Sequence, residues 1–350
     1  MDWGSSLIKS LESEGVLLRY RSQNSSQEIG FAYDLMAGFK IAEYLLKGDF
    51  NSWITKNIHK IQYNQPNSNT LAYDVFNSLV GLYPKHYARK HLWQLLDGDF
   101  RERALLQTTQ EQAALINRET IEEFQKYLLS SEQFASKAFT KLKTTRSAYA
   151  HPFDANFLDK ALRDMRNTYR DLTWSEWIRR NSRELKNDLD VLEKRWSQIE
   201  IGSNEKGRAI WVQWLLTTNH RDLRDQATKA LSIYAKKDPK TLFEMAINSL
   251  DISDPYVTER VFAAAYGGIL SADFIDSEKI KNNVCYFAQK IIENCFIPDA
   301  KYSTTHTILR EYFLGIINYA LKITQSLANS NMRCDSFKSL MIINKLSKFL

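Results

Sequence analysis

The chain is poor in glycine and proline. Its 350 residues include 12 Gly and 6 Pro, which leaves few of the turns that a strand-rich fold needs and few segments that would stay unfolded. The long segments between them are rich in Leu, Ala, Lys, Glu and Arg, which favour helices. Because 44% of the residues are hydrophobic, the chain can bury a large core. We therefore expect an all-α fold.

Cysteine is scarce as well. Cys285, Cys295 and Cys334 are widely spaced and lie in the last fifth of the chain. An odd number of cysteines at such spacings fits neither a disulfide framework nor a four-ligand zinc site. We therefore expect a reducing compartment, and a cytoplasmic location fits best.

Long hydrophobic runs are missing. The longest, Val261–Leu270, is about half the roughly 18 residues that a membrane span requires, and it contains two glycines. The residues Met1–Ser5 lack the cationic segment and apolar core of a signal peptide. The net charge of +6 is modest and does not identify nucleic acid as a partner. We expect a soluble protein without a membrane partner.

The sequence also lacks the Gly-x-x-x-x-Gly-Lys-Ser/Thr pattern whose backbone amides and lysine hold nucleotide phosphates. His86 and His91 are five residues apart, which places them on different faces of a helix, and no Cys or carboxylate stands at ligand spacing. We therefore expect no cofactor, no metal and no enzymatic activity.

One catalytic pattern competes with that expectation. Arg146 and His151 have the Arg-x-x-x-x-His spacing of HEPN ribonucleases, in which the two side chains stabilise a phosphate and move its proton. Chance alone predicts about one such match in this composition. In addition, Ser147 stands where that family usually has Asn, Asp or His, and Pro152 follows the histidine. The ribonuclease interpretation is therefore disfavoured.

The N-terminal residues combine a helix, a β-hairpin and a second helix. Apolar residues have helical spacing over 3–14, and two strand-like runs, Val16–Tyr20 and Ile29–Tyr33, flank a polar tip. Helical spacing returns over Asp34–Leu46. This order resembles a winged helix. The last helix offers Lys40 as its one basic residue, so we do not expect it to read DNA.

We expect three parts along the chain: a winged-helix-like segment over 1–50, a helical linker domain over 51–150 and helical repeats over 151–350. The polar cluster Gln62–Thr70 predicts a loop and a candidate junction. The helices expected after residue 50 are 74–83, 92–96, 111–129, 132–142, 156–169, 174–196, 208–218, 221–236, 238–250, 255–270, 277–295, 303–328 and 333–349. The later helices pair with a period of about 35 to 40 residues, which is typical of α-solenoids.

Two stretches of the second half share one pattern. In 215–231 and in 254–267, a polar turn with Asp opens a helix whose apolar residues are three or four apart, and alanines stand where a neighbouring helix would come close. The spacing of Asp222-Leu223-Arg224, Ala227 and Ala230-Leu231 resembles the second helix of a HEAT repeat. The resemblance implies an irregular HEAT-like α-solenoid.

Other segments resemble bacterial STAND-class antiviral NTPases. Residues 11–17, 29–34 and 41–46 are similar to the winged-helix region that follows the nucleotide-binding core of those proteins, and Arg170–Trp174 is similar to a segment of their antiviral members. The resemblance implies that the chain is the C-terminal part of such a protein, in which the helical array senses a phage protein. The ATPase activity is not carried over, because the phosphate loop is absent.

Five side chains are our candidates for partner binding. Arg163, Arg166 and Arg170 recur at i, i+3 and i+7 and so would line one face of a helix, while Trp174 and Trp177 are three residues apart. The arginines suit nucleic acid or an acidic protein, although ion pairs with their acidic neighbours are a sufficient explanation. The tryptophans suit a peptide or a base, although such pairs more often pack in a core.

Three further arginines, Arg221, Arg224 and Arg260, hold corresponding repeat positions. We expect them to connect adjacent helices through carboxylates such as Asp222 and Asp254. Taken together, the sequence predicts a non-catalytic helical-repeat region that recognises a protein ligand, and nucleic-acid binding is the alternative.

Overall fold

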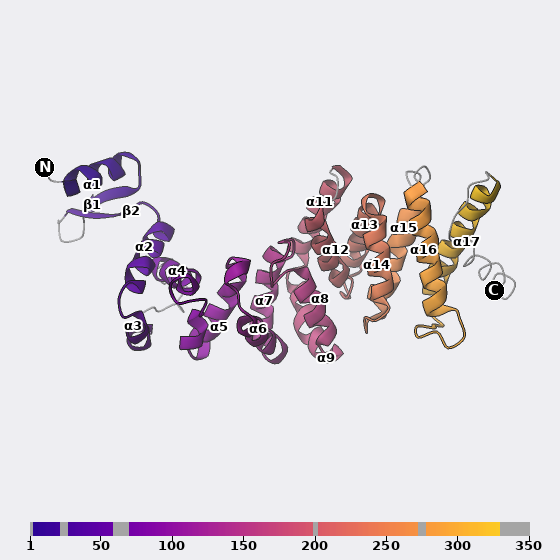
Figure 1. Cartoon of the computed structure of the whole chain (residues 1–350), viewed down its shortest axis with the longest axis horizontal. Coiled ribbons are helices and arrows are strands. Elements are labelled where there is room, and N and C mark those ends of the chain that lie inside the picture. Colours follow the sequence, from indigo (N-terminus) through magenta and orange to yellow (C-terminus); the bar gives the residue numbers. More distant parts are fainter. Residues whose placement is uncertain (1–2, 22–26, 59–69, 199–201, 272–277, 330–350) are drawn as a thin grey trace. The chain divides into compact units, whose positions relative to one another are not determined.

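The computed structural model divides into two compact units, Met1–Ser130 and Ser131–Leu350. Both units consist mainly of helices, and a two-stranded antiparallel sheet is the one sheet in the part of the chain that the structure describes. The expected all-α fold with a small β-hairpin is therefore confirmed. The described residues are 3–21, 27–58, 70–198, 202–271 and 278–329 (Figure 1).

Two expectations fall outside those ranges. The predicted helix over 333–349 and the predicted loop over 62–70, apart from Thr70, lie outside the described residues. The three-part division at residues 50 and 150 stays a prediction.

The first unit contains the hairpin. Its strands β1 and β2 pair antiparallel, with Leu17 opposite Phe31 and Arg21 opposite Gln27. The expected order of helix, hairpin and helix is confirmed, and α2 packs on α4, where Gly38 leaves no space for a side chain beside Asp74. The elements are α1 (Trp3–Ser13), β1 (Leu17–Arg21), β2 (Gln27–Phe31), α2 (Asp34–Leu46), α3 (Phe50–Asn57), α4 (Thr70–His86), η2 (Leu92–Leu95), α5 (Gly98–Gln107), η3 (Thr108–Gln110), η4 (Ala113–Leu115) and α6 (Arg118–Ser130).

Some expected helices of this unit have different bounds. The expected helix 74–83 is longer at both ends, since α4 runs from Thr70 to His86 and contains Pro84 in its last turn. The expected helix 111–129 begins only at Arg118, and the residues before it form short 3₁₀ turns. The Thr108 hydroxyl turns back to donate to the Leu105 carbonyl, which helps to end α5.

The second unit is a run of stacked helices. Several of them begin where an aspartate accepts a hydrogen bond from a backbone amide of the first turn: Asp154 before α8, Asp238 before α14 and Asp254 before α15. The elements are α7 (Glu132–Thr145), α8 (Ala155–Asp164), α9 (Asn167–Arg170), the π-helical turn η5 (Asp171–Ser175), α10 (Glu176–Arg180), α11 (Ser182–Gln198), α12 (Ser203–Leu215), α13 (Arg221–Lys237), α14 (Pro239–Ser249), α15 (Pro255–Leu270), α16 (Glu278–Cys295) and α17 (Thr307–Asn329).

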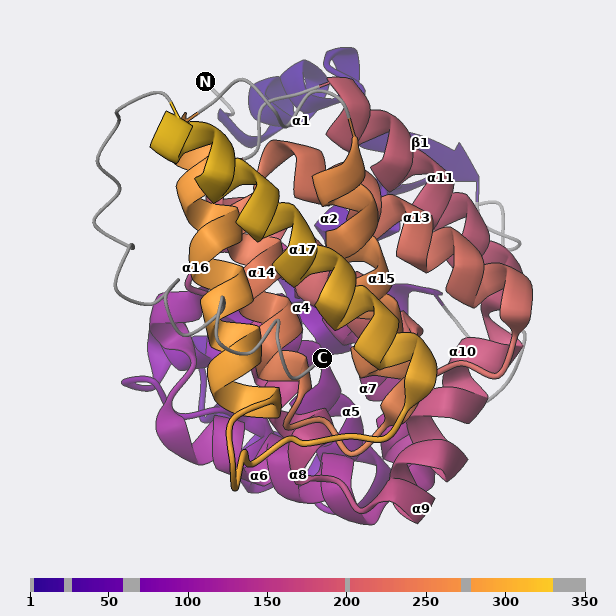
Figure 2. The ribbon, with the colours of Figure 1, turned by 90° about the vertical axis from the view of Figure 1, so that its right-hand side faces the viewer.

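Alternate helices of this unit are neighbours. α11, α13, α15 and α17 follow one another in one layer, and α12, α14 and α16 follow one another in a second. Figure 2 shows α17 lying across α15 and beside α16. α13 and α15 approach closely because small residues meet there: a Cβ atom on Gly268 would lie only 2.6 Å from the Cβ of Ala235. This arrangement supports the expected α-solenoid.

A continuous series of phenylalanine rings crosses both layers. Phe243 of α14 stacks on Phe287 of α16 with ring centroids 4.4 Å apart, and Phe287 lies 5.7 Å from Phe262 of α15. Phe262 in turn contacts Phe313 of α17 edge to face at 4.7 Å. These four rings are buried, so they form the core of the last helices.

Among the described residues, we find no helix that combines the length and the apolar character needed to cross a membrane.

Candidate ligand groove

The second unit carries a groove between α14 and α16 with a volume of about 320 Å³. The buried rings of Phe243 and Phe287 form its floor, and they lie nearly parallel, at an angle of 4°. Ile247 adds a half-buried aliphatic side chain. The floor of the groove is therefore apolar, which suits an aromatic or branched aliphatic side chain of a ligand.

The rim of the groove is polar and partly aromatic. Tyr286 stands on it with 60% of its surface exposed, and Lys290 lies with its ammonium 5.5 Å from the centre of that ring. Lys240, Glu244, Asn248 and Asn283 complete the rim. The groove therefore combines an apolar floor with hydrogen-bonding groups at its edge, which is the usual composition of a recognition site.

The rim lysine is held in place by one carboxylate. Lys290 Nζ donates to Glu293 Oε2 at 2.8 Å, and this hydrogen bond raises the pKa of Lys290 and lowers the pKa of Glu293. Gln289 donates to the other oxygen of Glu293 at 2.7 Å. Gln289 and Lys290 both reach the carboxylate of Glu293 one turn further along α16, and this contact favours a position of the Lys290 charge beside Tyr286.

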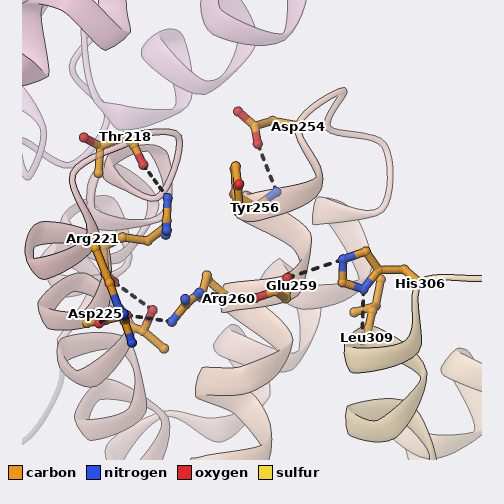
Figure 3. A network of polar contacts seen from close by, with 11 residues as sticks. Thr218, Arg221, Asp225, Asp254, Tyr256, Glu259, Arg260, His306 and Leu309 are labelled. Carbon is orange, nitrogen blue, oxygen red and sulfur yellow. Dashed lines mark hydrogen bonds and ion pairs between the residues drawn. The ribbon is translucent and has the colours of Figure 1, made fainter.

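The opposite layer is connected by polar contacts that run from helix to helix (Figure 3). Arg260 of α15 donates to Asp225 of α13 at 2.8 Å, and Glu259 faces His306, just before α17, at 3.4 Å. Arg221 lies 3.6 Å from the same Asp225. Two of these contacts join neighbouring parts of this layer, α13 with α15 and α15 with the residue before α17, and the groove lies on the other layer.

The expectation for the repeat arginines is confirmed in part. Arg260 does connect adjacent helices, but its partner is Asp225. Arg224 donates to the Thr218 carbonyl at 2.9 Å and lies over the ring of Tyr256, with its guanidinium carbon 4.4 Å from the ring centre. Asp222 pairs with Lys186 at 3.4 Å, and Asp254 caps α15.

The expected arginine face does not exist. α8 ends at Asp164, and Met165 and Arg166 have extended backbone, so the three arginines do not belong to one helix. Arg163 pairs with Asp159 at 2.9 Å and donates to the Asn248 carbonyl at 3.2 Å. Arg170 is only 2% exposed, and Arg166 is exposed. The prediction of one basic stripe was wrong, because the chain turns at Met165 to bring Arg170 under the loop before α15.

The two tryptophans of the predicted binding set are part of the core. Trp174 and Trp177 are buried, stack at 5.3 Å, and meet Trp211 edge to face at 5.3 and 5.7 Å. The indole N–H of Trp174 donates to the Trp214 carbonyl at 3.0 Å, and that of Trp177 donates to Thr140 at 3.1 Å. With their ring faces and their donors used inside the protein, these side chains do not offer a surface to a partner.

The Arg-x-x-x-x-His pattern has a structural use. Arg146 Nη2 donates to both oxygens of Asp188, at 2.8 and 3.0 Å, and Nη1 donates to the Lys143 carbonyl. Burial lowers the pKa of Arg146, and the Asp188 carboxylate opposes that shift. The His151 Nδ1 accepts the backbone N–H of Phe153 at 3.1 Å. Arg146 thus joins the end of α7 to α11.

The first unit contains a buried acid and base pair. The His91 Nδ1 lies 3.3 Å from Glu111 Oε2, and His91 Nε2 lies 3.1 Å from the Leu115 carbonyl. Burial raises the pKa of Glu111, and nearby His91 and Lys85 oppose the shift. The described residues contain no cluster of three or more His, Cys, Asp and Glu side chains that could hold a metal ion.

Comparison with known proteins returns no relative: no family model matches the chain, and neither a curated protein nor a solved structure matches it. The groove between α14 and α16 is the feature of the second unit that points to a function. Sequence reasoning did not identify it, since Phe243 and Phe287 have the spacing of ordinary core residues. One signal was present: Tyr286 is an aromatic residue that lies off the buried stripe of α16, which includes Val284, Ala288 and Ile291.

Proposed function

We propose that the second unit is a non-catalytic helical-repeat interaction module that binds a segment of a protein ligand in the groove between α14 and α16. The observation that carries the proposal is the exposed Tyr286 above the stacked rings of Phe243 and Phe287. Aromatic side chains around a small hydrophobic pocket are typical centres of protein recognition. An array of stacked helices supplies the rigid support that such a pocket needs.

The resemblance to STAND-class antiviral NTPases extends the proposal. In that interpretation the ligand is a phage protein, and its binding is coupled to an ATPase core. The repeat architecture supports a sensor of this kind, because an elongated stack of helices presents a large surface to a folded ligand.

Nucleic-acid binding is the weaker alternative on these residues. The expectation of nucleic-acid binding depended on a stripe formed by Arg163, Arg166 and Arg170. Two of these arginines instead donate hydrogen bonds within the second unit, Arg163 to the Asn248 carbonyl and Arg170 to the Ser253 carbonyl. A binding measurement with duplex and single-stranded DNA at two salt concentrations separates the two proposals, since real phosphate neutralisation gives a steep loss of affinity with salt.

The test of the proposal uses peptide selection. A displayed library of random peptides is selected on the full chain, and the affinity of the enriched peptides is measured for the parent, for Tyr286→Ala and for Tyr149→Ala. Tyr149 is a matched control, because it is also an exposed tyrosine of the second unit and lies outside the groove.

We expect Tyr286→Ala to weaken binding at least tenfold, which corresponds to about 1.4 kcal/mol, and Tyr149→Ala to leave it unchanged. Peptides that bind both variants as tightly as the parent, or a selection without enrichment, would overturn the proposal.

A further inference from the structure

The first unit contains a cavity of its own. It has a volume of about 260 Å³ and lies between α2, α4, α5 and the short turns that precede α6. Sites for drug-sized ligands usually have roughly 300–1,000 Å³, so this cavity suits a smaller molecule. The lining residues that matter for its chemistry are Ser78, Gly81, Leu82, Lys85, Glu111 and Leu115.

One face of α4 forms a wall of the cavity. Ser78, Gly81, Leu82 and Lys85 recur every three or four residues and therefore share this face. Gly81 stands at its centre, and a Cβ atom there would meet nothing within 4 Å. Since alanine is favoured over glycine inside a helix and no close neighbour excludes alanine here, helix packing does not account for Gly81. Its missing side chain keeps the cavity open.

A buried carboxyl forms another part of the wall. The Glu111 side chain is 2% exposed, and its Oε2 lies 3.3 Å from His91 Nδ1. The other ring nitrogen of His91, Nε2, lies 3.1 Å from the Leu115 carbonyl. Because a carbonyl only accepts hydrogen bonds, Nε2 carries the hydrogen and Nδ1 is directed to Glu111. This contact positions the carboxyl beside the cavity that Glu111 lines.

The burial of this carboxyl favours a cationic group in a ligand. Burial raises the pKa of Glu111, because the charged form loses hydration, and nearby His91 and Lys85 oppose the shift only in part. A ligand ammonium group in the cavity would replace some of the lost hydration by a charge-assisted hydrogen bond.

Lys85 gives the cavity a charge of the opposite sign. It is exposed, lies about one turn of α4 beyond Gly81, and is near enough to Glu111 to act on its pKa. Leu82 and Leu115 add apolar surface to the lining. The cavity therefore offers a carboxylate, an ammonium group and an apolar wall within one small volume.

We propose that the cavity binds a free α-amino acid with an apolar side chain, whose ammonium group donates to Glu111 and whose carboxylate pairs with Lys85. Such a zwitterion matches both charges of the lining at once, and its side chain lies against the apolar wall. A simple amine matches Glu111 alone, and a simple carboxylate matches Lys85 alone. The site lies within the first unit and is independent of the groove in the second.

Isothermal titration calorimetry of the full chain tests the proposal with L-leucine and L-phenylalanine. Each amino acid is compared with the amine and the acid that keep its side chain but lack one of its charges: 3-methylbutylamine and 4-methylpentanoate, and 2-phenylethylamine and 3-phenylpropionate. We expect at least one amino acid to bind, its acid to bind at least tenfold more weakly, and its amine about threefold more weakly, because the exposed Lys85 contributes less than the buried Glu111.

Two results of this comparison would overturn the proposal. One is no detectable binding of either amino acid at about 10 mM, which is tenfold above a millimolar Kd. The other is an amine or an acid that binds as tightly as its amino acid, since one of the two charges would then have no role.

Three variants test the place of binding. Gly81→Leu fills the cavity and Glu111→Gln removes its buried charge, so we expect each to weaken binding at least tenfold, and Lys85→Gln to weaken it about threefold. Lys126→Gln is the matched control, because Lys126 is also an exposed lysine of the first unit and lies outside the cavity.

Urea denaturation shows which variants remain folded. Lys85→Gln changes an exposed side chain, so it keeps the test decisive even if Gly81→Leu does not fold. Unchanged affinity in a folded variant of the three, or equal losses in Lys85→Gln and Lys126→Gln, would place the ligand elsewhere and overturn the proposal.

Discussion

Gly207 of α12 packs directly against the backbone carbonyl of Arg146 at the end of α7, and the space between them admits no side chain. Backbone cannot move aside as the end of a flexible side chain can. We expect Gly207→Ala to lower the free energy of unfolding by about 1–3 kcal/mol, the usual cost of overpacking. Urea denaturation followed by circular dichroism measures the change.

Gly81 in α4 provides the comparison, because a Cβ atom there meets nothing within 4 Å. Gly81→Ala should stabilise the first unit by about 0.5–1 kcal/mol, since alanine loses less backbone entropy in a helix. If Gly207→Ala proved as stable as the parent, the close contact between α12 and the end of α7 would be wrong.

The second prediction concerns Arg170. Its guanidinium donates to the Leu162 carbonyl and to the Ser253 carbonyl, each at 3.4 Å, and lies 5.6 Å from the ring centre of Trp214. Arg170→Met keeps much of the volume but leaves these buried acceptors without their donor, so we expect a loss of about 1–3 kcal/mol in unfolding free energy.

Arg166→Met is the control for that variant, because Arg166 is exposed. Its unfolding free energy should stay within about 0.5 kcal/mol of the parent value. Equal losses of unfolding free energy in the two variants would show that the buried contacts of Arg170 do not stabilise the fold.

The third prediction is a pH dependence. Burial raises the folded-state pKa of Glu111 above its ordinary value of 4.5. The folded protein then binds more protons than the unfolded protein. The contribution of Glu111 to the free energy of unfolding is therefore largest below about pH 4.5, and it is lost as the pH rises through the folded-state pKa. Glu111→Gln cannot ionise. We therefore expect its free energy of unfolding to increase relative to that of the parent as the pH rises from about 4.5 through the folded-state pKa of Glu111. His91 and Lys85 face this carboxyl and stay unchanged in the variant.

Glu293 is the control with the opposite sign. Its hydrogen bond with Lys290 lowers its pKa, so the contribution of its charge is present above about pH 4.5 and is lost as the pH falls through the folded pKa. Urea unfolding of the parent, Glu111→Gln and Glu293→Gln at several pH values between 3 and 8 separates the two. A difference between Glu111→Gln and the parent that does not change with pH would contradict the raised pKa.

The fourth prediction concerns cysteine reactivity. Cys285 and Cys295 are buried free thiols, and burial raises the pKa of Cys295 to about 12. Since the thiolate is the reactive form, neither thiol should react with a disulfide reagent at pH 8 while the chain is folded. In a Cys334→Ser variant, which removes the third thiol, we expect two equivalents of reaction only after addition of urea. Rapid reaction of the folded variant would show that the core of α16 opens.

Much of the fold could be predicted from sequence because local signals and tertiary packing agree there. α2 begins at Asp34 and ends at Leu46 as expected, since its apolar spacing starts directly after the hairpin. Asp238 and Asp254, each followed by proline, mark the starts of α14 and α15 because the pair supplies both the cap and a fixed first turn.

The prediction of an arginine stripe was wrong because tertiary contacts determine the backbone conformation at Met165 and Arg166. Nothing in the sequence between Asn156 and Tyr169 breaks a helix: glycine and proline are both missing. The break at Met165 follows from distant partners, since Arg163 reaches Asn248 and Arg170 reaches Ser253, more than 80 residues along the chain. The groove could not be predicted for a similar reason. The separation of α14 and α16 depends on how these helices pack on each other and on α15, which local sequence does not show.

The phenylalanine series changes how any binding data on this protein should be interpreted. Phe287 forms the floor of the groove, and through Phe262 it is in ring contact with Phe313 of α17, which does not line the groove. Closely packed core rings transmit strain to one another. A substitution at Phe313 could therefore lower the affinity for a ligand by displacing Phe287 in the floor of the groove. In the same way, a ligand bound against Phe243 could change the packing of Phe313 in α17.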